Sequence, residues 1–304
     1  MTAKGEKTLS KLLRVNHKNV IFALGFCFKP MKVTKQLLLC AMAAMMFASC
    51  ANINKVMKSS DADYKYEVAK QYFMRGKYEN ASLLLNDVLA SMKGTDKSDE
   101  SLFLLGMCKY NSGDMVAAND YFSKYYTTYT SGIHVEEAYF YSGMSLFLST
   151  VEPSLDQTAT YNAVTEFQNF IEAYPQSKFA AEARKLIFDL QDKLVEKEYL
   201  SAQLYYNLGD YFGNCTMGGS NYEAAIITAQ NAIRDYPYTR RKEDFSILIL
   251  RAKYDLAVRS IESKMKDRYN DAIDEYYGFV NEYPKSKYMD EAKKIYEKAQ
   301  KAIK

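Results

Sequence analysis

The sequence predicts an all-α protein in which antiparallel helix pairs stack side by side. From Tyr64 onward, apolar and aromatic residues recur at helical spacing, and turn residues interrupt them about every dozen positions. Two distant segments nearly repeat each other, EAYPQSKFAAEA at 172–183 and NEYPKSKYMDEA at 281–292, and RDYPYTRR at 234–241 shares their Tyr-Pro. Internal repetition of helical units is typical of a solenoid, in which each pair buries its apolar face on the next.

The first element in chain order is a leader at 31–49. A positive region, an apolar run and two small residues precede Cys50 in this order: Lys32 and Lys35, Leu37–Phe47, then Ala48 and Ser49. A signal peptide has this layout, and the run is too short to span a bilayer permanently. The ending resembles the lipobox of bacterial lipoproteins, although Phe47 stands where Leu is usual. That resemblance implies cleavage before Cys50 and attachment of acyl chains, such as palmitate, to it.

The leader sets the expected domain organisation. Residues 1–30 are interpreted as an over-extended gene start with Met31 as the initiator. The alternative is a long leader, because Val20–Phe28 is also apolar. Residues 50–63 are expected to be a lipidated N-terminus and linker. The competing interpretation of Cys50 is an ordinary core cysteine in a buried helix.

Charge and composition narrow the function classes. Residues 1–49 hold eight of the 40 Lys and Arg and one of the 37 Asp and Glu, which leaves 32 basic against 36 acidic residues. A nucleic-acid-binding protein would carry a basic excess, so none is expected as a partner. His134 is the only His after the leader, which argues against His-based catalysis and His-rich metal sites. A Cys108–Cys215 disulfide stays open as a possibility.

Aligning the chain on its prolines exposes the repeating unit. An Ala lies twelve residues before three of the prolines, with apolar residues four and seven positions after the Ala: Ala163, Phe167 and Phe170 before Pro175; Ala225, Ala229 and Ala232 before Pro237; Ala272, Tyr276 and Phe279 before Pro284. Earlier units keep the small and aromatic positions without the Pro. We expect the small residues where two helices cross closely and the Pro where the second helix ends. Ser177 and Ser286 are expected to cap the helices that follow.

This spacing resembles the tetratricopeptide repeat, a helix–turn–helix of about 34 residues. The resemblance implies an α-solenoid of about five helix pairs followed by a C-terminal capping helix. We expect N-terminal repeats at 64–175 and C-terminal repeats with the capping helix at 176–304.

A narrower resemblance covers Leu155–Phe212. This segment is similar to the middle of the BamD (YfiO/ComL) family of outer-membrane assembly lipoproteins. The matching features are Asp156-Gln157-Thr158, Tyr174-Pro175-x-Ser177, Ala180-Ala181-x-Ala183-Arg184, Lys197-Glu198 and Gly209-Asp210-Tyr211. The segment GNCTMGGSN at 213–221 departs from the family by lengthening a tight turn, which puts contacts of that corner in doubt.

The resemblance implies a lipid-anchored scaffold on the periplasmic face of the outer membrane. The C-terminal repeats would hold the barrel-inserting subunit (BamA-like) and other assembly lipoproteins. The N-terminal repeats would offer a groove to unfolded outer membrane proteins, with four candidate lining residues: Tyr72, Tyr78, Tyr110 and Tyr121. The competing interpretation of each is repeat packing, because aromatic stripes at helical spacing are usually core. Asp156, Gln157 and Thr158 form the family-motif loop, where Asp156 and Thr158 also suit plain loop and cap roles.

No motif points to catalysis. The sequence has no Gly-rich phosphate loop, Cys-x-x-Cys, His-Glu-x-x-His or nucleophile elbow. We therefore expect no enzymatic activity, no cofactor and no metal. A second hypothesis is a glycan-capture or other repeat adaptor lipoprotein. The absence of Trp argues against sugar platforms.

Overall fold

The structure is a computed structural model that describes residues 53–95, 97–211 and 220–304. The chain divides into two units, 1–58 and 59–304, and residues 53–57 form a short helix in the first. The predicted extension, the signal peptide, Cys50 and Cys215 lie outside the described residues, as does most of the 213–221 segment. The domain boundaries at 30, 49 and 175 stay predictions.

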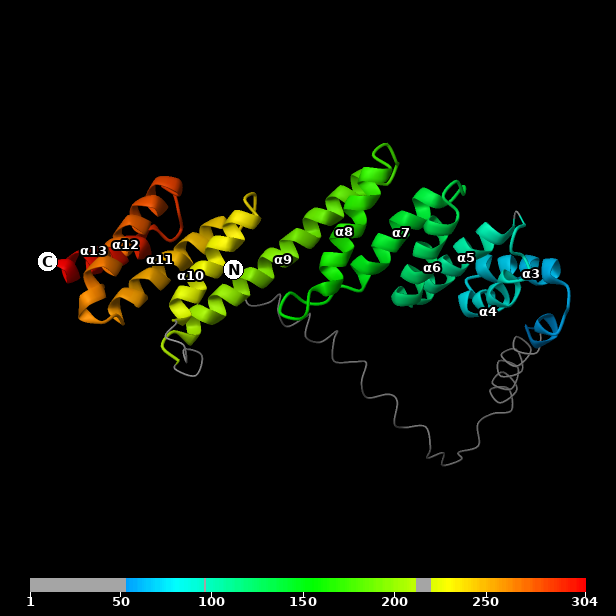
Figure 1. Ribbon diagram of the computed structural model, residues 1–304, viewed down its shortest axis with the longest axis horizontal. Helices are drawn as coiled ribbons and strands as arrows, with labels where there is room; N and C mark the ends of the chain where they lie inside the picture. Colours follow the sequence, from blue (N-terminus) through cyan, green and yellow to red (C-terminus); the bar gives the residue numbers. More distant parts are fainter. Residues whose placement is uncertain (1–52, 96, 212–219) are drawn as a thin grey trace, which may run out of the picture. The chain divides into compact units, whose positions relative to one another are not determined.

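The described residues of the second unit form helices joined by turns and loops, with no strand among them (Figure 1). The helices follow in order: α3 (Ala62–Met74), α4 (Tyr78–Leu89), α5 (Lys97–Ser112), α6 (Met115–Thr128), α7 (Val135–Leu148), α8 (Thr158–Ala173), α9 (Ala180–Leu208), α10 (Asn221–Asp235), α11 (Lys242–Val258), α12 (Glu262–Glu282) and α13 (Met289–Ile303). They form five pairs, α3–α4 to α11–α12, with α13 last. This confirms the predicted all-α, tetratricopeptide-like solenoid with a capping helix.

The helices pack in two rows. Each helix packs on its sequence neighbours, and the first helices of successive pairs also touch one another, from α3 and α5 through to α11 and α13. The second helices of successive pairs lie farther apart. The first helices therefore form one continuous row of touching helices. We call this set, α3, α5, α7, α9, α11 and α13, the inner row.

Small residues stand where helices of a pair cross. A Cβ added to Gly106 of α5 would lie 2.6 Å from the Phe122 ring of α6, and one added to Gly143 of α7 would lie 2.6 Å from the Phe167 ring of α8. The repeated alanines of the second helices are buried: Ala81, Ala118, Ala163, Ala225 and Ala272. The small residues thus lie where two helices cross closely, as predicted.

Four of the five second helices end at a recurring corner. Their C-cap residue is a Tyr with ψ between 61° and 65°, namely Tyr129, Tyr174, Tyr236 and Tyr283, whereas α4 ends at Ala90 with helical ψ. Pro follows three of these tyrosines, and a residue before Pro is driven out of the helical region. Thr130 follows Tyr129 and the corner keeps its geometry, so Pro reinforces this corner without being required for it.

The capping roles predicted for Ser177 and Ser286 are wrong. Helices α9 and α13 have Phe179 and Tyr288 at their N-caps, with no side-chain cap. Instead, Ser177 Oγ accepts from the Phe179 N–H at 3.3 Å, and Ser286 Oγ accepts from the Tyr288 N–H at 2.9 Å. Thr239 accepts from Arg241 in the same way at 3.2 Å. The hydroxyl therefore stabilises the turn before the helix, because it folds back on a backbone group two residues ahead.

Helix α9 is shared between two cores. Its N-terminal half contributes Ala183, Leu186 and Leu190 to a core with α7 and α8. Its C-terminal half contributes Val195 and Ala202 to a core with α10 and α11. At 29 residues it is the longest described helix, which accounts for the wide spacing of the prolines on either side of it.

Candidate functional site

The four candidate tyrosines divide between the two rows. Tyr72 and Tyr110 lie on α3 and α5 of the inner row, whereas Tyr78 and Tyr121 lie on the second helices α4 and α6. Two members of the set thus lie on the inner row. The structure does not gather all four on one row.

The two inner-row tyrosines also serve as packing residues. The Tyr110 ring stands edge-on to Tyr141 of α7 at 5.1 Å between centroids and to Phe122 at 6.5 Å. Burial raises the pKa of Tyr110 above its ordinary value. Tyr72 is only 6% exposed, and Lys77 Nζ lies 5.8 Å from its ring centroid. Tyr110 consequently has more surface to offer a ligand than Tyr72.

The two second-row tyrosines are half-buried. Tyr78 packs edge-on against Phe73 at 5.6 Å between centroids. The Tyr121 hydroxyl donates to Asn86 Oδ1 of α4 at 3.0 Å. Each ring therefore has an identified packing partner, and a role in lining a groove stays a prediction for all four.

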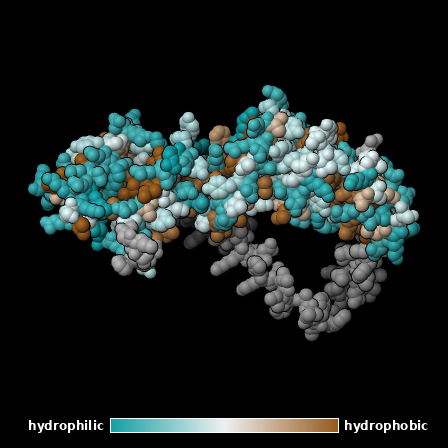
Figure 2. Space-filling view, viewed as in Figure 1, coloured by the Kyte–Doolittle hydropathy of each residue, from teal (hydrophilic) through white to brown (hydrophobic). Residues whose placement is uncertain are grey.

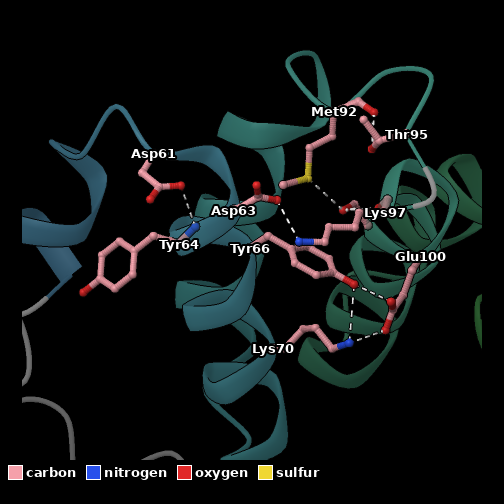
Figure 3. A network of polar contacts seen from close by, with 10 residues as sticks. Asp61, Asp63, Tyr64, Tyr66, Lys70, Met92, Thr95, Lys97 and Glu100 are labelled. Atoms are coloured by element: carbon pink, nitrogen blue, oxygen red, sulfur yellow. Dashed lines mark hydrogen bonds and ion pairs between the residues drawn. The ribbon is translucent and has the colours of Figure 1, made fainter.

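A polar network joins α3 to α5 at the N-terminal end of the inner row (Figure 3). Tyr66 donates its hydroxyl proton to Glu100, and Lys70 Nζ lies 2.7 Å from Glu100 Oε1. Lys97 Nζ also pairs with Asp63 at 2.7 Å. Sequence reasoning missed this network. A signal existed, because two of the three inter-helix pairs, Tyr66–Glu100 and Asp63–Lys97, are 34 residues apart, which is one repeat length.

The network shifts the titration of its members. Burial, followed by the hydrogen bond to Glu100, raises the pKa of Tyr66 to about 12. Burial acts to raise the pKa of Glu100, but hydrogen bonds from Lys70 and Tyr66 outweigh it and hold that pKa below its ordinary value. At neutral pH Tyr66 is therefore a neutral phenol beside the Glu100 carboxylate.

The family-motif loop precedes α8 and is held by its own side chains. Gln157 is 2% exposed, and its Nε2 donates to the carbonyls of Glu152 at 2.8 Å and Leu155 at 3.1 Å. Asp156 Oδ1 accepts from the Thr158 N–H at 3.0 Å, and hydrogen bonds from Thr158 lower the Asp156 pKa. The three motif residues thus fix the turn into α8, and Asp156 remains exposed beside it.

The C-terminal inner row is tied by ion pairs. Arg251 of α11 holds Glu291 of α13 in two bonds of 2.6 and 2.7 Å. Arg241, at the start of α11, pairs with Glu196 of α9 at 2.5 Å. The Tyr206 hydroxyl of α9 donates to Asp255 of α11 at 2.7 Å. These contacts fix the mutual orientation of α9, α11 and α13.

Three further features of the described residues bear on the site. Within the described ranges, no group of three or more His, Cys, Asp and Glu residues is placed to hold a metal ion. None of the described helices is long and apolar enough to cross a membrane. Cys108 is buried, and burial raises its pKa to about 12, so its thiol is protonated at neutral pH.

Comparison with known proteins now identifies the family. The family model described as "YfiO: Outer membrane lipoprotein" matches residues 57–216, more than half of the chain. The outer membrane protein assembly factor BamD of Caulobacter vibrioides is 22% identical over 172 residues, which cover 55% of this chain and 56% of that protein. The chain thus spans about half the length of this curated relative. The matched region runs from the start of the repeats to the end of α9, and the protein therefore belongs to the BamD/YfiO family of outer membrane lipoproteins.

Proposed function

We propose that this protein is an outer membrane protein assembly factor that works as a lipid-anchored scaffold on the periplasmic face of the outer membrane. It holds a barrel-inserting subunit and other assembly lipoproteins, and it receives segments of unfolded outer membrane proteins. It catalyses no reaction. Acyl chains on Cys50, exposed by removal of the signal peptide at 31–49, provide the membrane attachment.

The family match over residues 57–216 carries this proposal. The Caulobacter relative named as an assembly factor supports it, at 22% identity. The fold gives physical support, because a row of first helices presents a long surface without requiring any part of it to react.

The two ends of the inner row suit different partners. The C-terminal end is braced by the Arg251–Glu291 and Arg241–Glu196 pairs, so it offers a pre-oriented surface to folded subunits. The middle and N-terminal part carries Tyr110 and Tyr141, which are half-buried rings that can contact an extended segment of varied sequence. We assign the folded partners to the C-terminal repeats and the unfolded clients to the N-terminal repeats.

Site-specific photo-crosslinking in living cells tests this assignment. The crosslinker replaces residues that are already exposed, so packing is kept. C-terminal positions on the inner row are Leu204 of α9 (58% exposed) and Val258 of α11 (40%), and N-terminal positions are Met74 of α3 (84%) and Leu148 of α7 (48%). We expect crosslinks to the barrel-inserting subunit from the first set and to barrel-protein clients from the second. No crosslink to a barrel-inserting subunit from any C-terminal position would contradict the proposal.

Protease treatment of intact cells separates the scaffold from the glycan-capture alternative. A protein on the periplasmic face is protected, whereas a surface glycan receptor is cleaved. The matched control is Cys50→Ala, which we expect to leave the membrane fraction because the acyl chains supply the attachment. Cleavage of the wild-type protein on intact cells would favour the glycan-capture function.

A further inference from the structure

Three corners of the repeat unit share one geometry but differ at one exposed position. The corners begin at Tyr174, Tyr236 and Tyr283, each followed by Pro. The residue after the Pro is Gln176, Tyr238 and Lys285, respectively. Tyr238 is 98% exposed, so its ring makes almost no contact within the chain. The Tyr238 ring therefore has no packing role within the chain.

A pocket of roughly 240 Å³ lies beside Tyr238. One wall comes from α9 and the other from the corner between α10 and α11; the lining residues are Phe188, Gln191, Asp192, Val195, Asp235, Tyr236, Pro237, Tyr238 and Thr239. Phe188 is 67% exposed although it lies within a long helix. Two residues with exposed rings thus contribute to the two walls of a single pocket.

The pocket lies at the junction of two cores, beside a corner that differs from its counterpart at 174–179. It lies where α9 passes from one core to the next, next to Val195 at the edge of the second core. The helix after the 174–179 corner has Phe179 at its N-cap, stacked on Phe140 at 4.6 Å between ring centroids. At the 236–241 corner the same position is Arg241, whose guanidinium lies over Tyr199 at 4.4 Å and pairs with Glu196. This corner has no aromatic residue of its own at that position.

The volume favours a single side chain as the occupant. Small-molecule sites usually measure about 300–1,000 Å³, and an apolar cavity of about 150 Å³ accepts benzene. A pocket of roughly 240 Å³ therefore fits one aromatic ring with its attached methylene better than it fits a whole cofactor. An aromatic anchor in such a pocket is the usual energetic centre of a peptide interface.

The charge of the pocket lining determines which residues of the bound peptide can stand next to its aromatic side chain. The charged residues in the lining are Asp192 and Asp235, both acidic. Asp235 is paired with Arg234 at 3.0 Å, whereas Asp192 has no ion pair within the described part of the chain. An unpaired carboxylate at the mouth favours a cation next to the anchor and disfavours an acidic neighbour or a terminal carboxylate.

We propose that the pocket between Phe188 and Tyr238 binds one aromatic side chain of an extended peptide segment that carries Lys or Arg beside it. The site is separate from the candidate tyrosines of the N-terminal repeats. It needs no premise about outer-membrane assembly, so its failure would leave the proposed function untouched.

Fluorescence anisotropy with the full mature chain tests the proposal. The probe is a fluorescein-labelled Gly-Ser peptide with one Phe between two Lys, compared with peptides in which Glu replaces the Lys or Ala replaces the Phe. We expect Tyr238→Gln, which copies the sister corner at Gln176, and Phe188→Ala each to weaken binding about tenfold or more. Asp192→Asn should reduce the preference for Lys over Glu. The matched control is Tyr64→Gln, because that exposed ring points away from its neighbours in Figure 3.

Several outcomes would overturn the proposal. Equal binding of the Phe and Ala peptides would show that no aromatic side chain occupies the pocket. Equal binding of the Lys and Glu peptides would show that Asp192 does not select a neighbouring cation. Wild-type affinity of the Tyr238→Gln variant for the probe would show that the Tyr238 ring takes no part in binding. Displacement of the probe by an oligosaccharide would assign the rings to sugar binding, and self-association that Tyr238→Gln abolishes would assign them to a second copy of the chain.

Discussion

The middle and C-terminal repeats share their corner geometry but join the inner row by different chemistry. In the middle repeats, Phe179 at the start of α9 stacks on Phe140 of α7 at 4.6 Å. In the C-terminal repeats, Arg251 of α11 holds Glu291 of α13 in two bonds of 2.6 and 2.7 Å. The joints therefore respond differently to solvent, since stacked rings are insensitive to salt and acid whereas a partly exposed ion pair is not.

The repeat fixes the helix crossing within each pair but leaves the contact between successive pairs free to vary. It fixes how the two helices of a pair cross, because the contact requires a small residue. At Gly143, for example, a Cβ would lie 2.6 Å from the Phe167 ring. The joint between pairs is free to be aromatic, polar or ionic, because it needs only two inner-row side chains within reach. Partner specificity can thus change along the solenoid without changing its fold.

The largest expected effect is Phe167→Ala in the middle core. Phe167 is fully buried against Gly143, so we expect a loss of about 3–5 kcal/mol of local unfolding free energy, from lost burial and the remaining cavity. Hydrogen exchange of α7 and α8 measures this loss. Phe188→Ala, at an exposed ring on α9, is the control and should change it by less than about 0.5 kcal/mol. An equal loss of unfolding free energy in Phe167→Ala and Phe188→Ala would contradict the distinction between the fixed helix crossings and the positions that are free to vary.

The next effect is on the Arg251–Glu291 joint. A double-mutant cycle with Arg251→Ala and Glu291→Ala should give a coupling of about 1 kcal/mol, which falls in about 1 M salt. The hydrogen bond from Arg251 lowers the pKa of Glu291. Its contribution is therefore complete above the ordinary pKa near 4.5 and is lost as the pH falls through the lower folded value.

Hydrogen exchange of α13 follows this joint under acid and salt. The Phe140–Phe179 joint serves as the internal control in the same sample. Equal salt and acid sensitivity at both joints would contradict the comparison.

A smaller effect is expected at Tyr66. Because its folded pKa of about 12 exceeds its ordinary value of 10.0, Tyr66 stabilises the α3–α5 contact fully below pH 10 and loses this contribution as the pH rises toward 12. Glu100→Gln should lower the pKa of Tyr66 but leave it above 10.0, because burial is the main cause. NMR with carbon-labelled tyrosine, assigned with Tyr66→Phe, gives the titration. An unchanged pKa in Glu100→Gln would show that the carboxylate has no part in it.

The smallest effect is expected at the corner hydroxyls. Ser286→Ala removes the bond to the Tyr288 N–H and should cost about 0.5–1 kcal/mol, seen as faster exchange in the first turn of α13. Ser177→Ala should give the same result at α9, because the corner is shared. A difference between the two that exceeds this range would mean that the corners are not equivalent.

The repeat itself could be predicted from the sequence, but the functional surfaces only in part. Ala163 and Phe167 recur at fixed offsets from a Pro, so their helix and burial follow from periodicity. Ser177 and Ser286 were misplaced because a hydroxyl before a helix can stabilise either the cap or the preceding turn. The Tyr66–Glu100 bond could have been predicted from its offset of 34 residues.

The pocket was not predictable from spacing. Phe188 lies among helical residues, where an aromatic ring is ordinarily core, and only the length of α9 and the placement of the corner leave it exposed. The sequence did give one indication at Tyr238, because this is the only aromatic residue that follows the Pro in the three aligned corners.

Depletion of the protein in its native host tests the central claim, that this solenoid is a scaffold for outer membrane assembly. The measurement is the fraction of an abundant barrel protein that is folded in the outer membrane, read from its mobility in gels before and after heating. The account predicts that this fraction falls on depletion and returns with the wild-type gene but not with Cys50→Ala. Normally folded barrels after complete depletion would contradict it.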